Sequence, residues 1–334
     1  MELYCYDSDI NLIDVIEKFS SLEWLEEYNG LGAFKLIADY TERNVEDLKQ
    51  NNILWKNNGE TAGIIEYVKY KDNIIECRGR LTNKLLEDRI ILNTITINNI
   101  EEGLRLAVSA NCIVRNEIPN LILGQLNNIA DIGKKMITHS TVFEAVNSYR
   151  SVGLKVIFNI EAKKHEVEFY KGIDRSLDVL FSEEFENIFE NEITSDATKY
   201  KNIAYVYGEG EGEAREYTVV DLSGGSYQNE LYVDARDIQK ELLTDEGYTA
   251  LLQERGIEKL ANQIQENTFK CNIKTDGVFK YKEDFFLGDF VTCRSDKYKI
   301  QFKVRVAQVK EIYNNKGYRI SAILGEQNKE VYYG

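Results

Sequence analysis

The segment KIQFKVRVAQV near the C-terminus constrains the fold more than any other stretch of the chain. It alternates Ile300, Phe302, Val304 and Val306 with Gln301, Lys303, Arg305 and Ala307. Because successive side chains of a strand point to opposite faces, this alternation predicts a β-strand with one buried and one solvated face. The turn signal NNKG then leads into a second apolar run, YRISAIL. The two runs predict a hairpin within an antiparallel sheet.

Residues 1–94 carry more signals of the same kind. The segment SLEWLEEYNGLGAFKLIA places Leu22 and Trp24 on one side of one strand and Phe34 and Leu36 on one side of the next. Three further short strands follow, divided by KNNGE and KDN. We therefore expect a first small antiparallel β-barrel domain over 1–94. Trp24 is expected in its core, although a surface anchor for a partner is the alternative.

Residues 95–172 have a different texture. The segment NNIEEGLRLAVSANCIV begins with asparagine and glutamate, as a capped helix does, and places Leu104 and Val108 on one face. Thr141 and Glu144 have the spacing of a capping box and predict a second helix start. An alternating segment follows, in which EAKKHE reads as a turn that exposes His165 to solvent. We expect an α+β middle domain over 95–172.

From Ile173 the strand signals return. We expect residues 173–334 to form a second β-barrel domain, with a helical insertion at about 236–267. Within the insertion, GIEKLANQIQENTF spaces Ile257, Leu260, Ala261 and Ile264 as on one buried helix face. The expected fold class is thus α+β and rich in β-structure, with two small antiparallel barrels around a middle domain.

The segment AYVYGEGEGEAR resembles a glycine-rich phosphate loop, but its chemistry argues against one. Glu209, Glu211 and Glu213 put carboxylates where a phosphate would bind, and the residues that follow favour a strand over a helix. We predict a hairpin of strands 203–207 and 216–220. We expect no cofactor, and neither nucleotide nor divalent metal should stabilise the fold.

The composition of the 334 residues bounds the function. With 43% hydrophobic and 29% charged residues the chain is an ordinary globular protein, and no N-terminal signal peptide or apolar run of membrane-spanning length is present. The net charge of -15 disfavours nucleic-acid binding. Five widely spaced cysteines read as reduced core residues, and two histidines without neighbouring ligands predict no metal site. No catalytic motif is recognisable, so we expect no catalytic residues.

The block from Gly172 to Arg215 resembles a known family. It contains D-R-S at 174–176, F-S-x-E-x-x-N at 181–187, and Y-K-N ahead of V-x-G-E-G-E-G at 200–212. Other segments agree in order, including ILWKNNGETAGIIEY, GRLTNKLLEDRIIL, ELYVDARDI and DFFLGDFVTCRS. In these motifs the chain is similar to the tail-tip, or baseplate, hub proteins of siphophages and prophages. The resemblance spans nearly the whole chain.

The resemblance implies a noncatalytic hub in the virion tail tip, made in the host cytoplasm without a signal peptide. Three copies would form a ring whose six barrels surround a channel and match the sixfold tail tube. Its partners would be the distal tail protein and the tail-tube or tape-measure proteins. DNA would touch it only in passage, and no stable membrane association is implied. Lytic activity in related proteins lies in C-terminal extensions, and we expect none here.

Two alternatives stay open: a tail-delivered cell-wall hydrolase, and a carbohydrate-binding tail protein with exposed tyrosines. For the hub, we expect an acidic or neutral channel wall, because a basic one would hold DNA by counterion release. Lys303 and Arg305 are the interface candidates, expected to point outward or into a subunit contact with Glu or Asp opposite. An ordinary solvated strand face is the other interpretation of these two residues.

Overall fold

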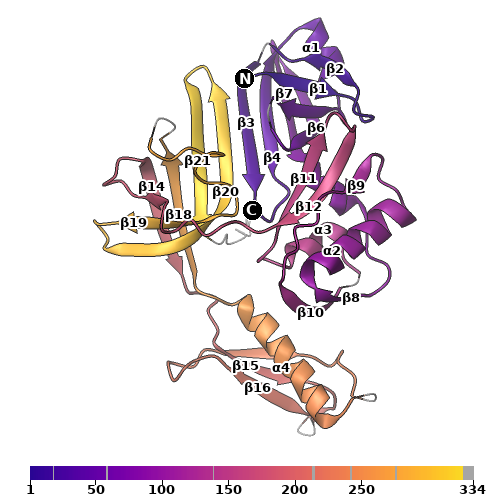
Figure 1. Cartoon of the computed structure of the whole chain (residues 1–334), viewed down its shortest axis with the longest axis vertical. Coiled ribbons are helices and arrows are strands. Elements are labelled where there is room, and N and C mark those ends of the chain that lie inside the picture. Colours follow the sequence, from indigo (N-terminus) through magenta and orange to yellow (C-terminus); the bar gives the residue numbers. More distant parts are fainter. Residues whose placement is uncertain are drawn as a thin grey trace. The chain divides into compact units, whose positions relative to one another are not determined.

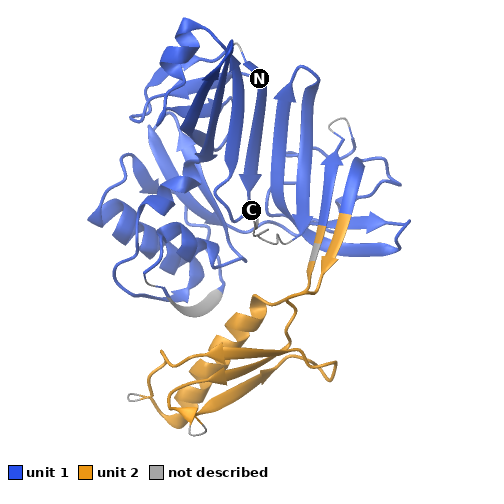
Figure 2. Ribbon diagram, turned by 180° about the vertical axis from the view of Figure 1, so that it is seen from behind, with its two compact units in different colours: residues 1–192, 269–326 blue, residues 193–268, 327–334 orange. Residues whose placement is uncertain are grey.

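The computed structural model describes residues 1–325 except 18, 58, 138, 213–214, 241–242 and 275–276. Among these residues the chain divides into two compact units, 1–192 with 269–325 and 193–268 (Figure 2). The larger unit contains strands from both ends of the chain, and the smaller unit is a single insertion between them. No helix in the described ranges is long and apolar enough to cross a membrane.

The N-terminal part of the larger unit is a series of antiparallel strands (Figure 1). They are β1 (Leu3–Tyr6), β2 (Leu12–Val15), β3 (Phe19–Glu27), β4 (Ala33–Asp39), β5 (Ile53–Lys56), β6 (Ala62–Lys71) and β7 (Ile74–Leu81), with α1 (Glu42–Asp47) after β4. The predicted β3–β4 hairpin is confirmed, and its register places Leu22 opposite Leu36 and Trp24 opposite Phe34. Trp24 is fully buried and stacks on Phe34 at 5.7 Å between ring centres, so the core interpretation of this residue is confirmed.

The C-terminal part supplies the other strands of the larger unit. They are β13 (Leu180–Phe181), β14 (Ile188–Asp196), β18 (Glu266–Ile273), β19 (Phe290–Ser295), β20 (Ile300–Asn314) and β21 (Gly317–Gly325). The predicted hairpin of β20 and β21 is confirmed, with antiparallel pairing from Val306 opposite Leu324 to Asn314 opposite Gly317. β14 and β18 extend across the sequence boundaries between the two units.

The two strand-rich regions share one largely antiparallel sheet and do not form separate closed barrels within the described residues. The hydrogen-bonded order is β14-β18-β21-β20-β3-β4-β7-β6-β5-β1-β2, with β19 on β20 and β13 on β19. β20 links them, because residues from Ile300 to Arg305 pair with β19 and residues from Gln308 to Asn314 pair with β3. On the other side, β5 is occupied by β1 and β6. Both edges of β5 and both edges of β20 are therefore paired with other strands. These two strands cannot pair with each other, so the first region does not close into a barrel.

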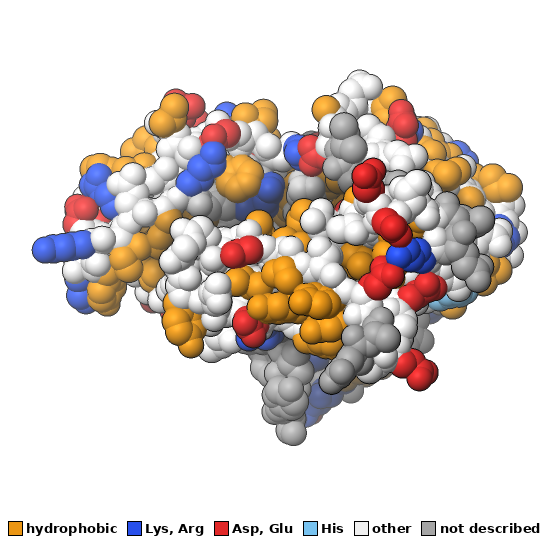
Figure 3. All heavy atoms as spheres, turned by 90° about the horizontal axis from the view of Figure 1, so that it is seen from below, with side chains coloured by type: hydrophobic (Ala, Val, Ile, Leu, Met, Phe, Trp, Pro, Cys, Tyr) orange, Lys and Arg blue, Asp and Glu red, His pale blue; other side chains and the backbone are white. Residues whose placement is uncertain are grey.

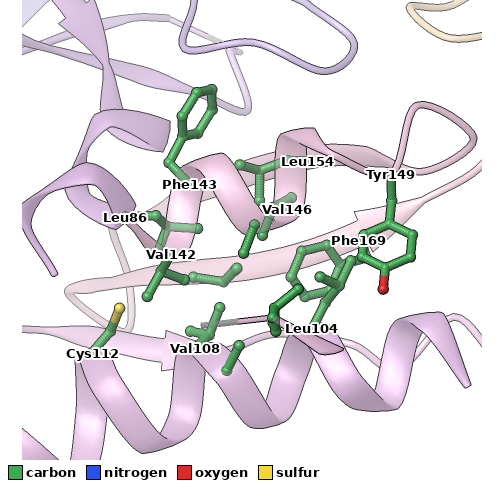
Figure 4. Packing of buried hydrophobic residues seen from close by; sticks show 14 of the residues in the cluster. Leu86, Leu104, Val108, Cys112, Val142, Phe143, Val146, Tyr149, Leu154 and Phe169 are labelled. Atoms are coloured by element: carbon green, nitrogen blue, oxygen red, sulfur yellow. The ribbon is translucent and has the colours of Figure 1, made fainter. Parts of the chain in front are cut away.

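The middle part of the larger unit is α+β. It consists of η1 (Thr82–Asp88), β8 (Ile95–Asn99), α2 (Ile100–Val108), the π-helical turn η2 (Ser109–Arg115), β9 (Leu121–Leu123), β10 (Ile132–Ile137), α3 (Val142–Asn147), β11 (Gly153–Asn159) and β12 (Lys164–Tyr170). Asn99 caps α2, and Thr141 with Glu144 forms the predicted capping box of α3. Leu104 and Val108 of α2 pack with Val142 of α3 and Phe169 of β12 (Figure 4).

His165 does not lie in a solvated turn, as its neighbours in sequence suggested. β12 begins at Lys164, and the register of β11 with β12 places His165 opposite Phe158. The imidazole is 4% exposed and lies 5.5 Å from the Phe158 ring. Burial lowers the pKa of His165 to about 4, so the ring is a neutral core residue at physiological pH.

The smaller unit is a three-stranded sheet with one helix. Its elements are β15 (Ile203–Tyr207), β16 (Tyr217–Asp221), β17 (Glu230–Asp234) and α4 (Asp245–Ala261). The predicted hairpin around the glycine-rich turn is confirmed, because β15 pairs with β16 in antiparallel register; β17 lies parallel on its other side. A helix is present in the expected insertion, and Thr244 caps its start.

The buried face of α4 agrees with the predicted one at Leu260 and differs from it at Ile257 and Ala261. Tyr248, Leu252, Gly256 and Leu260 are buried against β15, β16 and β17, whereas Ile257 is 53% exposed. A Cβ at Gly256 would lie 2.7 Å from the Val220 side chain. The close approach of the helix to the sheet at Gly256 therefore sets which face is buried, and apolar spacing alone did not indicate it.

Candidate functional site

The two interface candidates on β20 have different surroundings. The Lys303 side chain is 47% exposed, and its Nζ contacts Oδ2 of Asp174 at 2.5 Å. It also lies 5.1 Å from the centre of the Phe290 ring. The contact with Lys303, followed by hydrogen bonds from Ser176, lowers the pKa of Asp174 to about 2. Lys303 is thus an exposed cation with an acidic neighbour in its own chain.

Arg305 lies between two aromatic rings. Its guanidinium carbon is 4.4 Å from the centre of the Tyr28 ring and 4.2 Å from that of Phe290. Nη1 donates a hydrogen bond to the Gly288 carbonyl at 2.9 Å. The planar cation therefore connects the loop after β3 with β19 and β20, and it stabilises the fold of its own chain.

The residues of the signature block hold loops in place. Asp174 accepts hydrogen bonds from the amide and hydroxyl of Ser176, at 3.1 and 2.6 Å. Arg175 donates to Oδ2 of the buried Asp289 at 2.8 Å. The D-R-S motif thus shapes the chain before β13 and ties it to the residue that precedes β19.

The two asparagines of the signature have similar tasks. Oδ1 of Asn187 accepts from the Ser182 amide at 3.0 Å, and its Nδ2 donates to the Leu180 carbonyl at 2.7 Å. Oδ1 of Asn202 accepts from the Asn229 amide at 2.7 Å, and its Nδ2 donates to a carbonyl in the loop before β17. Each amide closes a loop, a purpose for which both donor and acceptor are needed.

The glycine-rich turn is occupied by contacts within its own unit. The amide of Glu209 donates to the Tyr248 hydroxyl at 2.6 Å, and Arg215 donates to the carbonyls of Tyr207 and Gly208 at 2.8 Å each. The next element is the strand β16, so no helix N-terminus points into the turn. Glu213 lies outside the described residues.

A buried ion network lies inside the curled sheet and was missed from the sequence. Glu311 on β20 pairs with Lys56 on β5 and lies 3.6 Å from Nζ of Lys282. Lys282 also contacts Glu26 at 3.3 Å. Burial raises the pKa of Glu311, but Lys56 and Lys282 outweigh it and hold the pKa at about 2. The sequence did contain a sign of this burial, because Glu311 is two residues after the apolar Val309 and therefore lies on the inward face of the same strand.

A pocket of about 480 Å³ adjoins this network in the larger unit. Its cations are each paired with a carboxylate: Lys155 with Glu60, Lys171 with Asp131, Arg175 with Asp289 and Lys282 with Glu26. Because these charges are compensated inside the chain, the pocket offers little attraction to an anion.

The cysteines and the possible metal ligands give little support to a nucleophilic or metal-dependent reaction. All five cysteines are free and buried, and burial raises the pKa of Cys5, Cys77 and Cys271 to about 12. Over the described ranges, no three His, Cys, Asp or Glu side chains gather as metal ligands. The thiols are therefore held as neutral core groups.

Comparisons with solved structures identify the fold. The tail protein of Neisseria meningitidis MC58 superimposes with a TM-score of 0.63 at 14% identity over 98% of this chain and 96% of its own. The prophage MuSo2 43 kDa tail protein of Shewanella oneidensis gives 0.62 at 11% identity over 97% and 98%. Prophage tail protein gp18 of Listeria monocytogenes EGD-e gives 0.62 at 12% over 99% and 96%. These likenesses show a shared fold.

No curated protein matches the chain. A family model, by contrast, matches residues 2–326, nearly the full length. It describes the Siphovirus ReqiPepy6 Gp37-like proteins, and the resemblance to phage tail proteins predicted from the signature block is confirmed. The chain belongs to the Siphovirus ReqiPepy6 Gp37-like protein family.

Proposed function

We propose that this protein is a noncatalytic structural hub of a phage or prophage tail tip, where it forms a ring that joins the tail tube to the distal tip. The observation that carries the proposal is the extent of the likeness: a siphovirus family model covers residues 2–326, and tail proteins share the fold over almost their whole length. The signature residues that stabilise loops, and the compensated charges of the pocket, suit a structural role.

The ring is a homotrimer in this proposal. Each chain brings two strand-rich regions joined through β20 and β3, so three chains present six such regions to the tube. Their barrel-like character would come from the curl of the sheet. The channel wall is acidic or neutral, so that DNA passes without being held. The proposed partners are the distal tail protein and the tail-tube or tape-measure proteins, and the proposed location is the virion tail tip.

Electron microscopy of the purified protein, alone and with its distal tail protein, tests the hub. A threefold ring with a central hole is the expected image. A protein that stays monomeric at high concentration and beside its partner would overturn the proposal. A zymogram on purified cell wall tests the hydrolase alternative, for which we expect no clearing.

A further inference from the structure

The smaller unit has one covered and one open sheet face. Side chains of Ala204, Val206, Val220 and Val233 lie against α4 in the core of the unit. The residues between them point to the other side of the sheet. That side carries Tyr205 and Tyr207 of β15, Tyr217 and Val219 of β16, and Tyr232 of β17, which we call the tyrosine face.

The rings of the tyrosine face are packed against one another and are also exposed to solvent. Tyr207 stacks on Tyr217 at 5.2 Å between ring centres and lies 5.4 Å from Tyr232. Tyr217 is 57% exposed and Tyr232 61% exposed, so the outer rings remain accessible. Figure 3 shows one face of the molecule, on which hydrophobic side chains, coloured orange, gather next to acidic ones. Exposed aromatic groups with hydroxyl tips are typical of protein interfaces.

The charges around the face differ between its two ends. Asp221 and Glu230 both lie opposite Ile203, on the strands that flank it. Oδ1 of Asp221 accepts a hydrogen bond from the Ser223 amide at 2.8 Å, and Glu230 accepts one from the Tyr205 hydroxyl. In the part of the chain that the structure describes, neither carboxylate forms a salt bridge with lysine or arginine. At the other end Asp234 contacts Arg215 and Arg236 and is neutralised. Since Asp221 and Glu230 have no cation beside them, they favour a partner with positive charge at their end of the face only.

We propose that the tyrosine face binds a helix- or hairpin-sized segment of another tail protein, with an apolar centre and lysine or arginine at one end. The size follows from the sheet, since three five-residue strands present roughly 15 by 17 Å, a little more than the width of one helix. The same face of a second copy fits less well, because it presents Asp221 and Glu230 in place of lysine or arginine. This inference deepens the proposed hub function and rests on it for the class of partner.

The stacking of the rings also separates this proposal from sugar binding. Sugars lie flat on exposed aromatic faces, whereas Tyr207 and Tyr217 cover each other with an angle of 24° between their planes. The facing sides of these two rings are thus used inside the protein, and the Tyr232 hydroxyl accepts a hydrogen bond from Nη1 of Arg215 at 2.8 Å. Such a surface matches the polar and apolar mixture of a protein segment.

The test uses the full chain, with the purified tail-tube, tape-measure and distal tail proteins of the same phage as probes in biolayer interferometry. We expect one of them to bind, and Tyr217→Ser/Tyr232→Ser to weaken its Kd by about tenfold or more. Asp221→Asn/Glu230→Gln, which leaves the core untouched, should weaken Kd by about threefold and flatten its salt dependence. The matched control Tyr67→Ser/Tyr70→Ser removes exposed tyrosines of β6 and should leave Kd unchanged.

Three results would overturn the proposal: no probe binds, both face variants bind as wild type does, or the tyrosine variant loses self-association or glycan binding in place of probe binding. Circular dichroism of each variant establishes that it is folded. Imaging distinguishes the two proposals, since a failed ring with intact, tyrosine-dependent binding removes only the hub, and an intact ring without such binding removes only the tyrosine face.

Discussion

Lys56 of β5 and Glu311 of β20 form a buried ion pair although their strands are not neighbours in the sheet. β3, β4, β7 and β6 lie between them in the hydrogen-bonded order, so the sheet curls until the two side chains meet. The Lys56 ammonium also lies 5.1 Å from the centre of the Trp24 ring. The ion pair thus connects β5 and β20 through their side chains, although no backbone hydrogen bonds connect these two strands.

Lys56→Met should lower the free energy of unfolding by about 3 kcal/mol, because it leaves the buried Glu311 with one cation fewer. Urea denaturation measures the change. Adding Glu311→Leu should recover part of the loss, since both charges are then gone. The control Lys310→Met removes a partly exposed pair with Glu23 and should cost less than about 1 kcal/mol. Equal losses for the two lysine variants would contradict the prediction.

Gly172→Ala should destabilise the larger unit by about 3 kcal/mol through overpacking. A Cβ at Gly172 would lie 1.9 Å from the carbonyl oxygen of Gly288, and backbone cannot give way as a flexible side chain can. The control Gly247→Ala, in the first turn of α4, meets only the Thr244 hydroxyl oxygen at 3.2 Å. It should change stability by less than about 1 kcal/mol. Thermal unfolding of both variants provides the comparison.

The sequence predicted the local structure well and the long-range pairing poorly. Alternation identified the β3–β4 and β20–β21 hairpins, and cap chemistry identified the starts of α2 and α3. The alternation of apolar and polar residues indicates which face of a strand is buried, but it does not indicate which other strand pairs with each of its edges. The pairing of β20 with β3, which merges the two expected barrels, therefore could not be predicted.

The site residues show the same division. Lys303 was expected to point outward or into a subunit contact with an acidic residue opposite, and its partly exposed ammonium contacts Asp174 of the same chain. Arg305 occupies the same strand, but its stacking partner Tyr28 is distant in sequence. The face of α4 was predicted only in part because a glycine decides it, and Gly256 contributes nothing to an apolar pattern. Propensity and period describe one element at a time, and packing between elements needs the tertiary structure.

Stability should fall as pH rises through about 6 because of Asp47. Burial first, and then a hydrogen bond to Asp14, raise the pKa of Asp47 to about 6 in the folded chain. The unfolded value is about 3.9, so the folded state binds the proton more tightly, and this contribution is complete below about pH 4 and lost above about pH 6. Asp47→Asn should therefore flatten the decline in urea midpoint between these values.

The control for this pH effect is Asp174→Asn. Lys303 holds the pKa of Asp174 at about 2, so its contribution changes below about pH 4 and leaves the higher window as in wild type. An Asp47→Asn protein with the same decline as wild type would show that another group is responsible.

The five cysteines should resist alkylation in the native protein. All are buried, and burial raises the pKa of Cys112 to about 11 and that of Cys5 to about 12, so thiolate is scarce at pH 8. Iodoacetamide and intact-mass measurement should find no label on the folded chain and complete labelling in urea. Rapid labelling of one native cysteine would reveal local opening around it.

Lys303→Ala and Arg305→Ala should separate assembly from stability. Lys303 contributes one exposed ion pair, so its loss should cost the monomer less than about 1 kcal/mol. Arg305 stacks on two rings and donates to the Gly288 carbonyl, so its loss should cost about 2 kcal/mol. If Lys303 faces a subunit or tail partner, as expected from the sequence, light scattering at graded concentrations will show weaker assembly for Lys303→Ala at unchanged melting temperature. The control Lys69→Ala, on the exposed part of β6, should assemble as wild type does. Unaltered assembly of Lys303→Ala would make this residue part of a solvated strand face.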